Sequence, residues 1–204
     1  MATLLLIGLL LGIAAWIKVQ DLSAQMRLSQ HGRDLYHALM TWSVDHENVL
    51  PDHDLGPGAT ANQAFRRLLQ DRLLMDEQVF SGIRSPYLAD GDLGVEPDFA
   101  QAVGPGENHW MLVGHLKMNS AGNTPLFFEN ALSPNWPLQW RDGWNMPEIR
   151  GRTWRGTVLV YHMDGSMNAV RLDQGREGLV LPDSAFPFQW RTKAPKILDV
   201  EDAR

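Results

Sequence analysis

The stretch ATLLLIGLLLGIAAWI, residues 2–17, contains no charged side chain and ends where Lys18 follows it. The chain continues through residues 18–47 as KVQDLSAQMRLSQHGRDLYHALMTWSVDHE, with no proline and one glycine. In this continuation large apolar residues recur at spacings of seven, four and three residues. These spacings place four residues on one face of a helix, namely Leu28, Leu35, Leu39 and Trp42. We predict one long helix that ends near His46, apolar on all sides in its first half and amphipathic in its second.

The uncharged run favours a membrane helix over two alternatives. Its sixteen residues would span roughly 24 Å, somewhat less than the ~30 Å hydrocarbon core of a bilayer. A secretory signal peptide should have a basic start and a small-residue cleavage site, but nothing basic precedes Lys18 and Leu22-Ser23-Ala24 is a poor site. A buried helix of a soluble protein is disfavoured because the run is apolar on every side. Trp16 and Lys18 suit the interfacial end of a membrane helix.

These patterns predict the domain organisation. Residues 1–18 form a transmembrane anchor, residues 19–50 continue the helix with an amphipathic face, and residues 51–204 form a globular head. Asn48 and Pro51 end the helix.

The composition excludes several classes of site. The formal net charge is −6, and nucleic-acid-binding domains usually show a basic surface, so we expect no nucleic-acid partner. The chain has no cysteine, which excludes disulfides, thiolate metal sites and cysteine nucleophiles. Eight tryptophans and twelve prolines in 204 residues indicate a loop-rich head rather than a helical bundle.

The rest of the chain predicts an α+β head. We expect a short helix after residue 60, capped by Thr60 or Asn62, and a helical turn at residues 76–80. The strand signals lie at residues 109–115, 125–129 and 157–172, the last being a hairpin that turns at Asp164-Gly165. Irregular structure is expected at residues 81–106, 131–154 and most of 173–204. The fold is thus a long N-terminal helix packed on a small antiparallel sheet.

Three stretches resemble a known family. GRDLYHALMTWSVDHENVLP, residues 32–51, is similar to the end of the helix in a large pseudopilin-like group. TVLVYHMDGS, residues 157–166, matches that group's Asp-Gly hairpin, and TPLFFEN, residues 124–130, resembles the strand before it. Together with the helix-then-sheet layout, they resemble type IV pilins and type II secretion pseudopilins. The resemblance is loose but touches most of the chain.

Two departures from the family stand out. The family's hairpin is preceded by a His, and Trp154 occupies that position here. Aligning Pro51 with the family's Pro places the family's processed start several residues before Met1, so the processing Gly and the Glu that follows it have no counterpart in residues 1–204. The resemblance therefore implies an upstream start or a member that is processed differently.

The resemblance implies a structural role in the bacterial inner membrane. The subunit would cross the membrane once, hold its head in the periplasm or outside the cell, and assemble with other pilin-like subunits into a type II secretion pseudopilus or type IV pilus-like filament. Gly8 and Gly12 form a small-xxx-small pair of the kind that lets membrane helices pack closely, although glycine is also common in such helices without that role. The predicted assembly helix presents Leu5, Gly8, Leu9, Gly12 and Trp16.

Polar side chains crowd the end of the long helix. Oxygen and imidazole groups at such density can bind a divalent cation, so calcium is a candidate, but a solvated loop is the simpler interpretation. The cluster comprises Asp45, His46, Glu47, His53 and Asp54. At the hairpin turn, Asp164 and Gly165 are expected to serve the turn itself, and His162 to be structural. We expect no resident cofactor or metal.

An alternative function rests on a loop rich in tryptophan and arginine. Such residues can stack on sugars, which would suit a static, membrane-anchored domain that binds carbohydrate or an envelope partner. The simpler interpretation is that the rings anchor the loop on the sheet. The patch comprises Trp136, Trp140, Trp144, Arg150, Arg152 and Trp154.

No enzyme motif supports catalysis. The chain contains no nucleophile elbow, phosphate loop, HExxH or dinucleotide fingerprint. We therefore predict that the protein is not an enzyme, and a membrane-tethered hydrolase ranks last among the alternatives.

Overall fold

One helix, α1 (Ala2–Asp45), dominates the computed structural model of the chain. The structure describes residues 2–82, 85–143, 150–153 and 155–203, and within residues 2–21 it describes the side chains at positions 12, 15, 16 and 18–20. The helix ends as predicted, because Glu47 and Asn48 take left-handed φ angles of 56° and 61°. The Asn48 N–H then donates to the Ser43 carbonyl at 2.9 Å, which satisfies one free carbonyl of the last turn.

The second helix, α2 (Ala61–Gln70), begins with a capping box. Thr60 accepts a hydrogen bond from the Gln63 N–H, and the Gln63 side chain accepts one from the Thr60 N–H. Asn62, the other candidate cap, is instead buried and donates to the carbonyls of Val103 and Gly104. A 3-10 turn, η1 (Glu77–Phe80), follows and confirms the predicted helical turn.

The larger sheet has five strands in the order β6-β5-β2-β1-β9, all antiparallel to their neighbours. Its strands are β1 (Trp110–Val113), β2 (Pro125–Glu129), β5 (Thr157–His162), β6 (Met167–Arg171) and β9 (Ile197–Leu198). Four of them lie within the stretches from which strands were predicted. The fifth, β9, comes from the tail that was expected to be irregular.

A second, four-stranded sheet in the order β4-β3-β8-β7 was not predicted. Its strands are β3 (Gln139–Asp142), β4 (Arg152–Thr153), β7 (Asp173–Gln174) and β8 (Leu179–Val180). The prediction of irregular structure at residues 131–154 and in the tail is therefore wrong at these positions. Strands of two to four residues are too short to show alternation, and they form only by pairing with distant segments. Two 3-10 turns, η2 (Asp183–Ala185) and η3 (Phe188–Arg191), follow.

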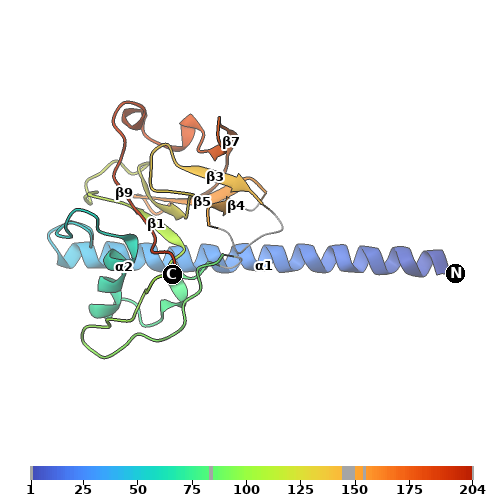
Figure 1. Cartoon of the computed structure of the whole chain (residues 1–204), viewed down its shortest axis with the longest axis horizontal. Coiled ribbons are helices and arrows are strands. Elements are labelled where there is room, and N and C mark those ends of the chain that lie inside the picture. The colour runs from blue at the N-terminus through green and yellow to red at the C-terminus, as the bar shows by residue number, and fades with distance from the viewer. Residues whose placement is uncertain (1, 83–84, 144–149, 154, 204) are drawn as a thin grey trace.

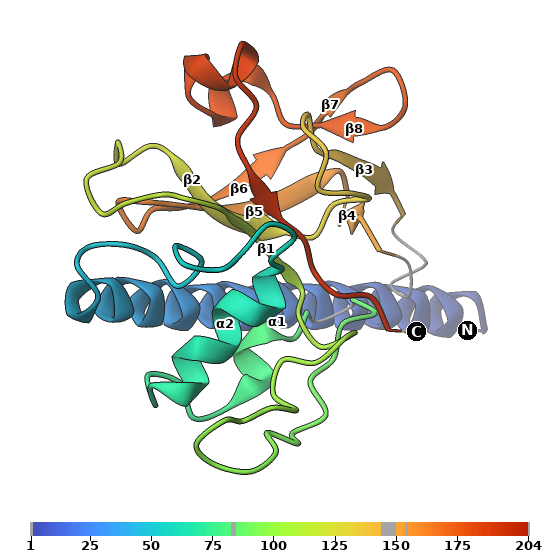
Figure 2. The ribbon, with the colours of Figure 1, turned by 60° about the vertical axis from the view of Figure 1, so that its left-hand side comes forward.

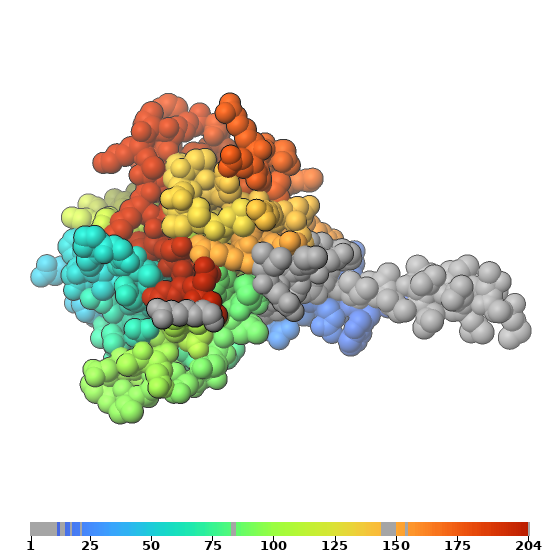
Figure 3. Space-filling view, viewed as in Figure 1, coloured from blue at the N-terminus to red at the C-terminus, as the bar shows by residue number. Residues whose placement is uncertain are grey.

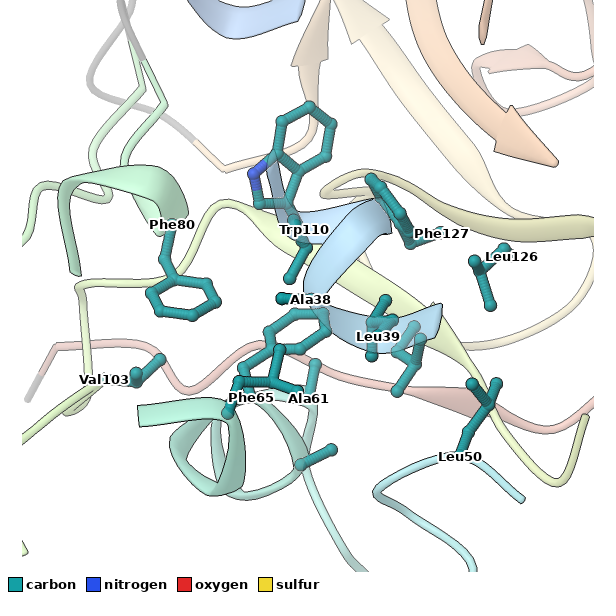
Figure 4. Packing of buried hydrophobic residues seen from close by; sticks show 14 of the residues in the cluster. Ala38, Leu39, Leu50, Ala61, Phe65, Phe80, Val103, Trp110, Leu126 and Phe127 are labelled. Atoms are coloured by element: carbon teal, nitrogen blue, oxygen red, sulfur yellow. The ribbon is translucent and has the colours of Figure 1, made fainter. Parts of the chain in front are cut away.

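The elements stack in layers (Figures 1 and 2). The five-stranded sheet lies on one side of α1, while α2 and the irregular segment after η1 lie on the other. One apolar cluster fills the space between the helices and the sheet, and Figure 4 shows Ala38, Phe65 and Trp110 converging there. A second cluster lies between the two sheets and includes Met111, Phe128 and Trp140. Alternate residues of β1 therefore face different layers.

Close contact between α1 and the sheet depends on a glycine. A Cβ at Gly32 would overlap the ring of Tyr161 on β5. The Tyr161 hydroxyl donates to the Ser29 carbonyl one turn earlier on α1, and the Tyr36 hydroxyl donates to the Met163 carbonyl at 3.2 Å. Burial raises the pKa of Tyr161 to about 12, so this hydrogen-bond donor stays protonated under ordinary conditions. These contacts hold the helix rigidly against the head.

Candidate functional site

The N-terminal half of α1 extends beyond the head (Figure 1). Several of the described apolar side chains in and next to this half are exposed. Trp16, Val19, Leu22 and Met26 are each 54–65% exposed. At about 100° per residue these positions fall within one third of the helix circumference. Ala24 and Leu28, which are buried, lie on the other side. We call the four exposed residues the apolar stripe of α1.

The predicted assembly residues fall only partly within the described side chains. Trp16 is 65% exposed, and a Cβ at Gly12 would meet no atom within 4 Å. The surroundings of Leu5, Gly8 and Leu9 lie outside what the structure describes. None of the described helices is long and apolar enough to cross a membrane. The anchor at residues 1–18 stays a prediction.

The polar residues at the end of α1 line an open groove of about 530 Å³. The fold adds side chains from α2 to those that the sequence placed together. The groove is lined by Trp42, Asp45, His46, Glu47, Val49, His53, Asp54, Arg67, Gln70 and Asp71. Four of these are carboxylates and one is an arginine, so the groove is acidic.

Pairing within the groove neutralises part of its charge. The Arg67 guanidinium forms an ion pair with Asp54 and holds the pKa of that carboxyl below its usual range. The His46 ring stacks on Trp42 with a centroid distance of 3.6 Å, and its Nε2 lies 3.6 Å from an Asp71 oxygen. These contacts fit the simpler interpretation of a solvated surface, in which Asp54 and His46 already have partners within the chain.

The calcium prediction gains no support at this groove. Among the described side chains, the one set of three or more whose ligand atoms could meet on a cation is Glu77, Asp90 and Glu107. Glu77 accepts hydrogen bonds from the Gly91 and Val103 N–H groups, and Glu107 accepts one from Gly104. Burial and the neighbouring carboxylates raise the pKa of Glu107. Glu77 thus ties η1 to the later segment at Gly91 and Val103, and Glu107 holds a local turn at Gly104, which are structural roles.

Of the four patch residues that the structure describes, Trp140 is buried, and Trp136, Arg150 and Arg152 are partly buried. Trp140 is fully buried and donates from Nε1 to the Asn130 carbonyl at 2.9 Å. Trp136 packs edge-on against Phe186 and Trp190, at centroid distances of 4.9 and 5.2 Å. Trp140 thus packs in the core cluster beneath β3, and Trp136 packs on the segment of 3-10 turns after β8, which fits the simpler interpretation that the rings anchor the loop. Trp144 and Trp154 lie outside the described residues.

The two arginines of the patch also face inward. Arg150 forms ion pairs with Asp199 and Asp202 and donates from Nε to the Ala131 carbonyl at 2.8 Å. The Arg152 Nε is buried and has no hydrogen-bond partner among the described residues. In this structure, therefore, neither Trp140 nor Arg150 is free to contact a sugar.

The hairpin turn has the expected geometry. Gly165 takes a φ of 80°, and the Asp164 side chain accepts a hydrogen bond from the Ser166 N–H at 2.9 Å. The hydrogen bonds from Ser166 hold the pKa of Asp164 below its usual range. His162 is 6% exposed and lies at the end of β5.

Asp52 is a buried carboxyl that sequence reasoning missed. Its side chain is 1% exposed, and Oδ2 accepts a hydrogen bond from the His115 N–H at 2.7 Å. The other oxygen, Oδ1, is buried and finds no hydrogen-bond partner in the part of the chain that the structure describes. Burial raises the pKa of Asp52, although His115 and Lys196 act in the opposite direction. No sequence pattern marked this residue, because it lies in a polar loop.

This burial predicts a pH-dependent stability difference between the wild type and Asp52→Asn. Because the pKa of Asp52 is higher in the folded state, the folded chain binds this proton more tightly than the unfolded chain does. The stabilisation from protonated Asp52 is therefore complete below the unfolded pKa, about 3.9, and is lost as the pH rises through the folded pKa. The wild type should therefore lose stability relative to the variant as the pH rises from about 4, near the unfolded pKa, through the raised folded pKa. Chemical denaturation at several pH values measures this. Asp173→Asn, at an exposed position on β7, is the control and should show no such trend. A constant difference across this range would contradict the prediction.

Comparisons with known proteins leave the family open. No family model, no curated protein and no solved structure matches this chain. The functional assignment rests on the residues themselves.

Proposed function

We propose that the protein is a structural subunit of a type II secretion pseudopilus or a type IV pilus-like filament and assembles through α1. The single observation that carries the proposal is the shape of α1. Its 44 residues correspond to a rod of roughly 66 Å, of which the C-terminal half packs in the head. The N-terminal half extends away from the head (Figure 1). A rigid helix held in this way can pack against copies of itself.

The apolar stripe supports the same proposal. Trp16, Val19, Leu22 and Met26 would be costly to leave in water, and contiguous exposed apolar surface usually marks an interaction site. In the proposed filament this stripe contacts the helices of neighbouring subunits. Before assembly the predicted anchor at residues 1–18, which includes Trp16, lies in the inner membrane, with the rest of the stripe and the head on the periplasmic side.

The test is to place charge on the stripe and measure self-association. In Leu22→Glu/Met26→Glu, two carboxylates would have to be buried at the helix contact, which costs several kcal/mol. We expect at least about a 100-fold weaker self-association of the full chain by analytical ultracentrifugation, and loss of filaments by electron microscopy.

The matched control carries the same charge elsewhere. Gln20→Glu/Gln25→Glu adds two carboxylates at exposed positions of the same segment, off the stripe, and should assemble like the wild type. If the stripe variant assembles as well as this control, the filament proposal fails.

A further inference from the structure

Three side chains from distant parts of the chain form a hydrogen-bonded row. The Ser85 Oγ lies 2.8 Å from the His109 Nδ1, and the His109 Nε2 lies 3.1 Å from the Glu129 Oε1. Ser85 belongs to the irregular segment after η1, His109 precedes β1, and Glu129 ends β2. Serine, histidine and a carboxylate linked in this order are the components of an activated nucleophile.

The fold determines how the three side chains meet. The antiparallel register of β1 and β2 pairs Trp110 with Glu129, which brings the preceding His109 beside the carboxylate. The His109 N–H donates to the Phe80 carbonyl at 2.8 Å, so the end of η1 also lies here. A Cβ at Gly82 would overlap both the imidazole and the Ser85 side chain. Glycine at this position is therefore required for the contact.

The surrounding hydrogen bonds select one tautomer of the imidazole. The Glu129 Oε2 accepts from the Leu159 N–H at 2.8 Å, which leaves Oε1 to accept the Nε2 proton of His109. The Nδ1 atom is then an acceptor, and the Ser85 hydroxyl and the Asn130 amide both face it at 2.8 Å. This is the protonation state that a general base needs.

Burial separates the roles of the three groups. His109 is 6% exposed and the Glu129 side chain 18%, whereas Ser85 is partly exposed. Among the residues that the structure describes, the Ser85 Oγ accepts one hydrogen bond, from the Tyr87 N–H at 3.2 Å. Its second lone pair stays available to an electrophile that arrives from solvent.

We propose that Ser85, His109 and Glu129 form an acyl-transfer site that hydrolyses carboxylic esters. The Ser85 Oγ attacks the ester carbonyl while its proton moves to the His109 Nδ1. The bond between the carbonyl carbon and the alkoxy oxygen then breaks, and the leaving alcohol takes the proton from Nδ1. Water attacks the acyl-serine with His109 again as the base, which releases the acid and restores the hydroxyl.

The surface beside Ser85 favours an apolar acyl group. Pro86 is exposed, and Leu88 is 62% exposed. Glu129 does not contact the substrate in this scheme. It is a positioning residue, which holds the imidazole tautomer and stabilises the imidazolium that forms. The site is independent of the filament proposal, because it does not involve the apolar stripe of α1.

The test is covalent labelling of the full chain with a fluorophosphonate. Attack by Ser85 forms an oxygen–phosphorus bond and expels fluoride, so peptide mass spectrometry should find one phosphonate on Ser85. Ser85→Ala should lose the label, and His109→Gln should label at least about 100-fold more slowly. Ser120→Ala is the matched control, since this partly buried serine instead accepts a hydrogen bond from the Lys117 N–H, and it should label like the wild type. The rate of p-nitrophenyl butyrate hydrolysis should be the same in the wild type and Ser120→Ala, lower in His109→Gln and lost in Ser85→Ala.

Glu129→Gln separates positioning from folding. The labelling rate should fall at acidic pH, where the protonated imidazole cannot accept the serine proton. Without the carboxylate the imidazolium is less stable, so the midpoint of this pH profile should move to lower pH in the variant. A purely structural role would leave the midpoint in place. A wild-type chain that takes no label on Ser85, or a folded Ser85→Ala chain that labels at the wild-type rate, would overturn the proposal.

Discussion

Replacing Trp110 by alanine should lower the free energy of unfolding of the head by about 3–5 kcal/mol. Trp110 is fully buried on β1, the strand between β2 and β9. Its ring meets those of Phe127 and Tyr161 edge-on, at centroid distances of 5.4 and 6.0 Å. Alanine would leave a cavity between the sheet and α1 (Figure 4). It would also remove the hydrogen bond from the Trp110 Nε1 to the Val79 carbonyl.

Urea denaturation followed by circular dichroism measures this loss. Trp16→Ala provides a matched control, because the same side chain is removed from a position that is 65% exposed. That variant should unfold within about 0.5 kcal/mol of the wild type, as expected for an exposed site. If Trp110→Ala lowers the free energy of unfolding by less than about 1 kcal/mol, the layer between helix and sheet is not the main core.

Replacing Arg150 by methionine should lower the free energy of unfolding of the head by about 2–4 kcal/mol. The Arg150 side chain is 18% exposed and pairs with Asp199 and Asp202 near the C-terminal end. Methionine fills similar space but leaves both carboxylates without their cation. Burial already raises the pKa of Asp199 despite the neighbouring guanidinium, so removing that charge should raise this pKa further. The loss of stability should therefore be larger at neutral pH than at acidic pH, where Asp199 is protonated.

The C-terminal segment should loosen in the same variant. Figure 3 shows this segment, in red, lying across the surface of the head. Hydrogen exchange should become faster in β9, which adjoins β1 at the edge of the five-stranded sheet. Arg72→Met is the control, because its ion pair with Glu96 is exposed and should contribute at most about 1 kcal/mol. Equal effects at the two positions would contradict a structural role for Arg150.

Much of the architecture follows from local patterns. The period of apolar residues predicted α1, the candidate caps Thr60 and Asn62 with the apolar face that follows predicted α2, and Asp164-Gly165 predicted the hairpin. These features lie within a few residues of each other along the chain, so their physical causes are local. These local patterns were enough to predict an α+β fold. The pilin-like identity stays a proposal.

The candidate sites were predicted less completely. The groove residues from Trp42 to Asp54 are close in sequence, so their proximity was foreseeable, whereas Arg67, Gln70 and Asp71 join them only through the packing of α2. In the loop that contains Trp136 and Trp140, composition could not distinguish an exposed patch from a buried anchor. Only the packing of the second sheet shows that Trp140 is internal. Ser85, His109 and Glu129 are separated by 24 and 20 residues, and no motif links them.

The sequence by itself determined the long helix, the turn and cap positions, the acidic and cysteine-free composition and the apolar segment that supports the filament proposal. Only the tertiary structure decided the second sheet, the pairing of β9 with β1 at the sheet edge, the burial of Asp52 and the contact between Ser85 and His109. The physical reason is the range of the interactions involved. Helical periodicity and turns arise from neighbouring residues. Short strands, buried carboxyls and side-chain relays exist only after distant segments have packed together.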